Sequence, residues 1–295
     1  MYTKMPLQLQ QLFTLFVILV LGKYAANVYL PWKSILLVLM ATVAIEHLLI
    51  YAKERSVTYF SFSSLSTAIG VMLMLATPHL WIVVLVIALG LIQKYYLKMR
   101  EKHFFNPSNF SIMVVLLFFY DSAHLILGQL GDSMWMKGIV SLLAVAILVR
   151  VERWLIPLVF VISYLLSQYF IVLQHDPMIL LEDVYHRFYA VSFIVFILFM
   201  LTDPRTTPKT FKMQIFFAVG VALFSTLLDY QYGFRVQHIF LSLFLVTPLV
   251  FFLTNYQEMQ YVKYFKIIGL AVVFLSLSAI IYIETKPPYH YEMSR

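Results

Sequence analysis

The chain has 295 residues, of which 62% are hydrophobic and 12% are charged, about half the charged fraction of a soluble protein. It contains no cysteine, which excludes disulfides, thiolate-held iron–sulfur clusters and cysteine-based zinc sites. The net charge of +7 does not indicate a nucleic-acid partner, because the basic residues stand in short segments between apolar runs. Membrane lipid is the environment that this composition predicts.

The apolar runs recur along the chain at the length needed to cross a hydrocarbon core of ~30 Å. They predict an all-α polytopic integral membrane protein with 10–11 transmembrane helices. Because the connections are short, residues 1–295 form one predicted integral membrane domain. The eleven candidate spans are 8–29, 33–52, 62–77, 79–97, 107–127, 135–150, 154–174, 184–201, 211–229, 236–254 and 263–283.

The distribution of Lys and Arg predicts the orientation of these spans. Of the 21 Lys and Arg residues, fourteen lie on the side of the N-terminus and seven on the opposite side, which also carries most of the acids. Basic loops stay in the cytoplasm. We therefore expect a cytoplasmic N-terminus and a periplasmic or extracellular C-terminus. The charges counted include Lys4, Arg100, Asp176, Lys263 and Arg295.

Two spans end alike, and this favours an internal repeat. The third closes on "GVMLMLATPHLW" and the eighth on "FIVFILFMLTDPRTTP", so that Pro78 and Pro204 are 126 residues apart. Five spans lie between equivalent points, and an odd number reverses the orientation. We therefore predict an inverted repeat, with repeat one at about 8–127, repeat two at about 135–254 and an extra helix at about 263–283. Short or interrupted spans at matching places point to a central site.

Two polar, proline-bearing corners interrupt the apolar sequence, and each has two interpretations. Asn106-Pro107 in "FNPSNF" is typical of a helix start, and so are Asp203-Pro204 and Thr207-Pro208 in "TDPRTTPKT". A helix N-terminus also presents N–H groups to an anionic or carbonyl-bearing ligand.

The amides and hydroxyls of these corners suit a polar ligand. Asn106 and Asn109 are three residues apart and share a helix face, and amides both donate and accept hydrogen bonds. Asp203, beside Thr202 and Thr206, is a candidate acceptor for a ligand hydroxyl or a cation. These residues alone leave the structural and the ligand-binding interpretations open.

Three segments resemble the RnfD/NqrB family, which comprises the RnfD membrane proteins of Rnf electron-transport complexes and the NqrB membrane proteins of the sodium-translocating NADH:quinone oxidoreductase. "FNPSNF" at 105–110 resembles the Phe-Asn-Pro signature, residues 68–94 are similar to the third and fourth spans, and "MLTDPRTTP" at 200–208 resembles the Thr-Asp-Pro segment. The resemblance implies two inverted five-helix halves, similar to urea transporters, and a flavin. The residues that it marks as cofactor-binding candidates are Asn106, Pro107, Asn109, Thr202, Asp203 and Pro204, with Thr206 beside them.

The chain departs from that family in one motif. No Ser-Gly-Ala-Thr occurs, so a covalent FMN on such a Thr is not expected, and the resemblance implies non-covalent riboflavin or FMN. A diverged stand-alone member, such as the RnfD-like membrane proteins of enediyne clusters, fits this departure. No His pair has a tight metal-ligand spacing, and no metal site is predicted.

The leading hypothesis is therefore an electron-transfer subunit of the bacterial inner membrane. It would pass electrons between other redox-complex subunits, or to quinone. A small-solute or ion transporter or channel on the same fold is an alternative, because the repeat predicts a central site. A membrane scaffold or accessory protein of a biosynthetic complex is another.

Some ionisable residues inside or beside the spans have no assigned role. Glu46 and His47, in the second span, either take part in a proton or ion path or snorkel to the cytoplasmic interface. Arg150, Glu152 and Arg153 are expected in a solvated turn.

Overall fold

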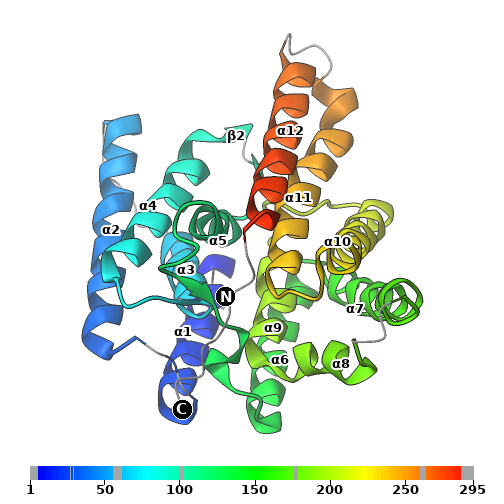
Figure 1. Ribbon diagram of the computed structural model, residues 1–295. Coiled ribbons are helices and arrows are strands. Elements are labelled where there is room, and N and C mark those ends of the chain that lie inside the picture. The colour runs from blue at the N-terminus through cyan, green and yellow to red at the C-terminus, as the bar shows by residue number, and fades with distance from the viewer. Residues whose placement is uncertain are drawn as a thin grey trace.

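A computed structural model describes residues 6–26, 28, 30–55, 62–99, 102–175, 179–259 and 264–286. Within these ranges the chain is almost entirely helical (Figure 1). The first six helices are α1 (Leu7–Ala25), α2 (Trp32–Glu54), α3 (Phe62–Met72), α4 (Leu80–Tyr96), α5 (Pro107–Phe118) and α6 (Met134–Arg150). The others are α7 (Leu155–Ser167), α8 (Leu181–Tyr189), α9 (Val191–Val195), α10 (Phe211–Tyr232), α11 (Gln237–Met259) and α12 (Phe265–Glu284), with π-helical continuations η2 (Gln168–Leu173) after α7 and η3 (Phe196–Met200) after α9.

Two short antiparallel strand pairs lie next to the ends of the shorter helices. Strand β1 (Leu75–Ala76) pairs antiparallel with β4 (His124–Leu125), and β2 (Lys98–Met99) pairs with β3 (Lys102–His103). A 3-10 turn, η1 (Leu127–Leu130), follows β4. Two predicted spans are therefore too long: the helix expected at 62–77 ends at Met72, and the one at 107–127 ends at Phe118.

Six helical segments are long and apolar enough to cross a membrane: α1, α2, α7 with η2, α10, α11 and α12. Helices α3, α4 and α5 are apolar but shorter. The prediction of one continuous helix at 184–201 is wrong, because α8 and the α9–η3 segment meet at an angle of 74°. Its first part, "LEDVYHRFY", is amphipathic, as expected of a helix that lies along an interface rather than within hydrocarbon.

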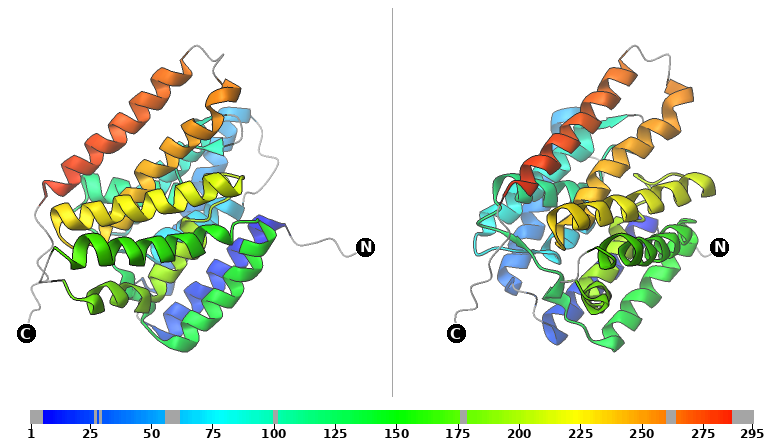
Figure 2. Two further views of the ribbon diagram at one scale, coloured as in Figure 1. Left: turned by 90° about the vertical axis from the view of Figure 1, so that its right-hand side faces the viewer. Right: turned by 45° about the vertical axis from the view of Figure 1, so that its right-hand side comes forward.

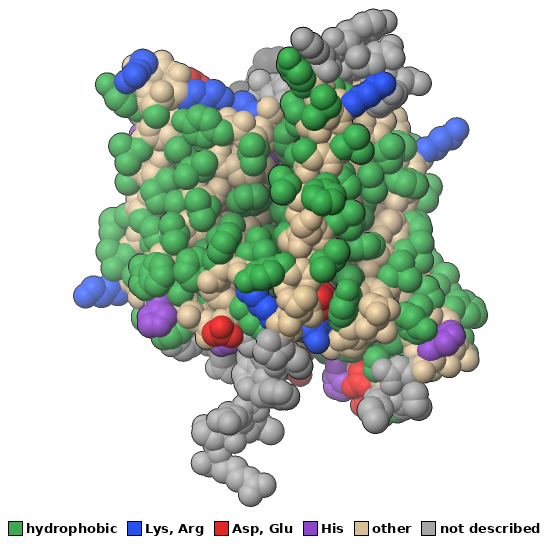
Figure 3. Space-filling model, turned by 45° about the horizontal axis from the view of Figure 1, so that its top comes forward, with side chains coloured by type: hydrophobic (Ala, Val, Ile, Leu, Met, Phe, Trp, Pro, Cys, Tyr) green, Lys and Arg blue, Asp and Glu red, His purple; other side chains and the backbone are tan. Residues whose placement is uncertain are grey.

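The surface agrees with a membrane environment. Hydrophobic side chains cover the middle of the face in Figure 3, while charged and histidine side chains lie mostly toward its upper and lower ends. Large apolar residues such as Leu142, Leu270 and Phe274 are exposed. This is an all-α polytopic membrane protein that spans the bilayer several times. The side on which each terminus lies stays a prediction, and Lys4, Arg100, Asp176, Lys263 and Arg295 lie outside the described residues.

Helices pack against one another within and between the two predicted repeats. In the first half α1 packs on α3, α2 on α4 and α4 on α5; in the second half α6 packs on α9, α7 on α10 and α10 on α11. The two halves meet where α1 contacts α6 and α5 contacts α11. Figure 2 shows α12 beside α11 at the outside of the bundle. The repeat boundaries themselves stay a prediction.

The helix α5 is held close to α4 at one glycine. A Cβ atom at Gly90 would lie 2.8 Å from the carbonyl oxygen of Pro107, so only glycine allows the two backbones this approach. Ser111 sits at the same crossing and donates its hydroxyl to the carbonyl of Val86 at 2.8 Å. The start of α5, where a polar corner lies, is thereby fixed against α4.

We expect Gly90→Ala to destabilise the protein, because the added methyl group must push α5 away from α4; overpacking of this kind costs about 1–3 kcal/mol. The thermal unfolding midpoint in detergent measures it. Gly138→Ala is the control, because nothing lies within 4 Å of a Cβ there and alanine favours a helix. Equal midpoints for the two variants would contradict the packing argument.

Candidate functional site

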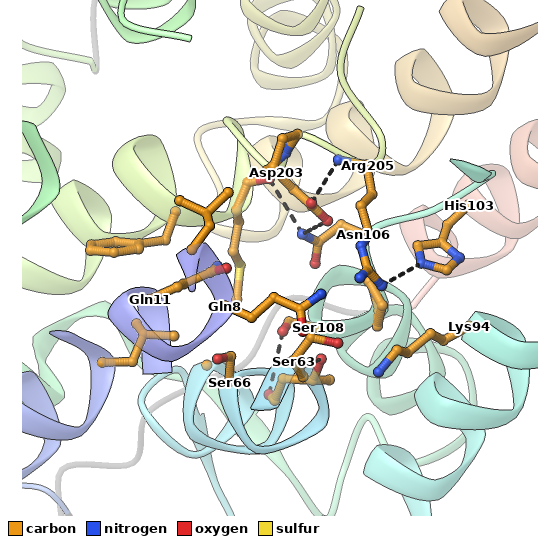
Figure 4. Close-up of a pocket in the computed structure, with 18 of the residues that line it drawn as sticks. Gln8, Gln11, Ser63, Ser66, Lys94, His103, Asn106, Ser108, Asp203 and Arg205 are labelled. Carbon is orange, nitrogen blue, oxygen red and sulfur yellow. Dashed lines mark hydrogen bonds between the residues drawn. The ribbon is translucent and has the colours of Figure 1, made fainter. Parts of the chain in front are cut away.

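The two polar corners meet at one cavity of about 120 Å³ (Figure 4). Its wall is formed by α1, α3, α4, β3, the start of α5 and the segment from the end of α9 to Arg205. Four of the seven residues marked in the sequence line it: Asn106, Pro107, Asp203 and Pro204. The other three, Asn109, Thr202 and Thr206, lie outside its wall. The cofactor role of all seven stays a prediction.

Asn106 caps α5 and joins it to the other corner. Its Oδ1 accepts from the backbone N–H of Asn109 at 3.1 Å, as an N-cap does. Its Nδ2 donates to Asp203 Oδ2 at 3.1 Å, across 97 positions of sequence. The helix start predicted at Asn106-Pro107 is confirmed, and the same side chain fixes the second corner.

The corner at Asp203 is a turn and not a helix start. Asp203 Oδ1 accepts from the backbone N–H of Arg205 at 3.0 Å, and its carbonyl accepts from the N–H groups of Thr206 and Thr207. Side-chain bonds of this kind compete with helix formation. The helix starts predicted at Pro204 and Pro208 are therefore wrong, since α10 begins only at Phe211. Burial raises the pKa of the Asp203 carboxyl, against the opposing effect of Arg205 and Asn106.

The marked residues outside the cavity have structural partners. Asn109 Nδ2 donates to the carbonyl of Phe240 at 3.1 Å and so links α5 to α11. Thr202 donates to the carbonyl of Leu198 at 2.6 Å, and Thr206 donates to that of Asp203 at 3.3 Å. These bonds support the framework around the cavity.

Three basic side chains face the cavity: Lys94 from α4, His103 from β3 and Arg205 from the turn. Burial, followed by the positive charges of Arg205, Lys94 and Lys98, lowers the pKa of His103 to about 3. His103 is therefore neutral at physiological pH, and its Nε2 lies 3.5 Å from Arg205 Nη1 as an acceptor.

A buried polar chain lies behind Lys94. Lys94 Nζ donates to Ser64 Oγ at 2.7 Å and lies 3.5 Å from Glu46 Oε1. The same Glu46 oxygen accepts from Tyr95 OH at 2.8 Å and from Ser64 Oγ. Glu46 is only 1% exposed, so the interpretation that it snorkels to the interface is wrong. It faces protein because α3 and α4 supply partners there.

Arg153 also departs from the sequence-based expectation. It is 5% exposed rather than solvated, and its Nε donates to Thr207 Oγ1 at 3.0 Å. Burial lowers the pKa of its guanidinium. Arg153 therefore joins the turn between α6 and α7 to the Asp203 corner.

A second buried network, which the sequence did not reveal, joins α8, α10, α11 and α12. Arg187 binds Asp229 through two N–H groups at 3.0 and 3.2 Å. His238 Nδ1 lies 2.6 Å from the same carboxylate, and its Nε2 lies 3.4 Å from Glu284. Arg235 completes the chain with a 3.1 Å bond to Glu284. Charged residues inside apolar spans were the available signal, but their pairing needs the fold.

Asn106 and Asp203 should be energetically coupled, because truncating either leaves a buried polar partner unsatisfied. We expect Asn106→Ala and Asp203→Ala each to lower the free energy of unfolding, and the double variant to lose about 1–2 kcal/mol less than the sum. Denaturant unfolding of the three variants measures this coupling. Strict additivity would mean that the bond contributes nothing.

His103 should make stability pH-dependent. In the unfolded chain it binds a proton near its ordinary pKa of 6.5, whereas in the folded protein its pKa is about 3. Stability is therefore lost as the pH falls from 6.5 toward 3, by about 1.4 kcal/mol per pH unit. The His103→Gln variant lacks this loss, so its unfolding midpoint should decrease less between pH 7 and pH 5. Parallel curves for the two proteins would refute a buried neutral His103.

The sequence was compared with known proteins and protein families. A comparison with curated proteins gives no significant match. A scan against protein families matches residues 102–262, more than half of the chain, to the NQR2, RnfD, RnfE family. The matched region begins just before the Asn106 corner and contains the Asp203 corner. The chain belongs to the NQR2, RnfD, RnfE family.

Proposed function

We propose that the protein is a membrane electron-transfer subunit that holds riboflavin or FMN non-covalently in the cavity and passes electrons between partner proteins or to quinone. The family, named for membrane subunits of electron-transport complexes, supports the general role. One observation supports placing the flavin in this cavity. The two motifs that resemble the family's signatures meet there through the hydrogen bond from Asn106 to Asp203.

The cavity has the two kinds of surface that a flavin ring system needs. Phe199, Met200 and Val195 form an apolar wall, and Asn106 and Ser108 lie on a polar one. A flat aromatic ring suits the first, and its carbonyl and N–H edge suits the second. The residues therefore fit the group, which when bound supplies electron transfer.

The size of the cavity limits how a flavin could bind. At about 120 Å³ it is smaller than the ~300–1,000 Å³ typical of ligand pockets. Gln8 and Gln11 of α1 line it, and α1 is among the least enclosed of the long helices. A complete flavin therefore requires these two side chains to move outward.

Purification in mild detergent tests the proposal. We expect a flavin absorbance, flavin in the acid extract and an unmodified polypeptide mass. Ser66→Leu should reduce the flavin content several-fold, because Ser66 lines the cavity and its hydroxyl, among the described residues, bonds only to the carbonyl of Phe62 in α3. Ser141→Leu, on α6 away from the cavity, is the matched control. A mass increment would show covalent attachment, and a protein without flavin would contradict the proposal.

A second candidate, a transporter for a small polar solute, is favoured by one feature. The cavity lies between segments of both halves, and the second half contains the 74° break between α8 and α9. Broken helices at a repeat interface are typical of transporters. Solute uptake into proteoliposomes by a flavin-free protein would support this candidate.

A further inference from the structure

Arg205 is a cation at the cavity whose guanidinium forms no salt bridge with a described acidic residue, although the nearby Asp203 carboxyl attracts its charge. Its guanidinium makes a single side-chain contact among the described residues, with the neutral His103 at 3.5 Å. No carboxylate there lies within salt-bridge distance of it. The nearest acid along the chain, Asp203, accepts instead from the backbone N–H of Arg205 and from Asn106.

A second cation is held beside it. Lys94 points toward the same space in Figure 4, and the charges of Lys94 and Arg205 oppose one another. Glu46, which does not line the cavity, lies with its Oε1 3.5 Å from Lys94 Nζ and partly balances that charge. Two like charges at one cavity repel each other, and the Asp203 carboxyl, which lines the same cavity, offsets part of this repulsion. A bound anion would offset the rest.

The remaining wall provides hydrogen-bonding groups suited to an anion. Helix α5 begins at the cavity with Pro107 and Ser108, so the positive end of its dipole lies there. Ser63 and Ser66 contribute hydroxyls from α3. The volume of about 120 Å³ admits a tetrahedral oxyanion with a short attached group, whereas a complete flavin requires Gln8 and Gln11 to move outward.

We propose that this cavity is a phosphate site in which Arg205 and Lys94 bind the oxygens of a phosphate group. Its assignment to the phosphate of a flavin mononucleotide rests on the proposed function, whereas the anion site itself does not. Arg205 binds through the fork of its guanidinium, with His103 positioning it, and Lys94 acts as a point charge.

A single engineered thiol reports the charge of the cavity directly, since the chain has no cysteine. In Ser66→Cys protein, we compare the labelling rates of an anionic and a cationic methanethiosulfonate, each normalised to a free thiol. We expect the anionic reagent to be favoured about tenfold. Equal rates, or a preference for the cation, would overturn the proposal.

Substitution of Arg205 tests whether this residue causes the preference for the anionic reagent. Adding Arg205→Gln should reduce the preference to near unity, whereas adding Lys209→Gln, at an exposed position of the same corner, should leave it unchanged. A shift in the thiol pKa cancels in the ratio of the two rates. A preference that survives Arg205→Gln would overturn the role of Arg205. If that variant does not fold, the labelling rate of Ser66→Cys is measured in inorganic phosphate and in chloride at equal ionic strength. Slower labelling in phosphate supports the site, and equal rates overturn it.

Protection also separates the sources of the phosphate. Protection by FMN at concentrations at least tenfold below those of riboflavin would support the flavin source. Protection by inorganic phosphate or phosphatidic acid, with neither flavin effective, would support the anion site while the proposed function fails. Equal protection by FMN and riboflavin, with none by phosphate, would overturn the phosphate site while leaving the flavin proposal intact.

Discussion

The hydrogen bond from Asn106 Nδ2 to Asp203 Oδ2, at 3.1 Å, is the contact on which the arrangement of the cavity depends. Each partner also organises its own segment: Asn106 caps α5, and Asp203 holds the turn that carries Arg205. Because both groups are largely removed from water, neither can exchange this bond for one to solvent without cost. The bond therefore fixes two distant parts of the chain against one another, and with them the walls of the cavity.

Each half of the protein adds a buried polar cross-link between its second and fourth helices. In the first half Glu46 on α2 and Lys94 on α4 are joined with Ser64. In the second, Gln168 at the end of α7 donates to Asp229 on α10 at 2.6 Å, and Arg187 joins them. Polar groups at such depth need internal partners. In each case the partner from a third helix, Ser64 on α3 or Arg187 on α8, completes the cross-link.

The residue pattern predicted most of the apolar helices and the Asn106 cap because these depend on local signals, namely run length and an Asn-Pro pair. The resemblance to a family marked both corners as cofactor-binding candidates, but the bond that joins them is seen only in the fold. The break at Ala190 and the burial of Arg153 and Glu46 could not be predicted, because a single sequence places a residue along a span without showing what packs against it. For the same reason Asp229, His238 and Glu284 gave no sign that they form one network: they come from three helices, and their pairing depends on how α12 packs on α11.

The contrast between the two charged regions supports the proposal of a ligand at one of them. In the α8–α12 network, Arg187 binds Asp229 and Arg235 binds Glu284, so each arginine has its own carboxylate. In that region the opposite charges are paired with one another, as expected of groups that hold helices together. At the cavity, among the described residues, the Arg205 guanidinium contacts the side chain of the neutral His103 alone, and the Asp203 carboxylate accepts from Asn106 and from the backbone of Arg205. A partly buried cation is costly when its charge is not fully balanced, so the proposed anionic ligand would add to the negative charge that Asp203 supplies at the cavity wall.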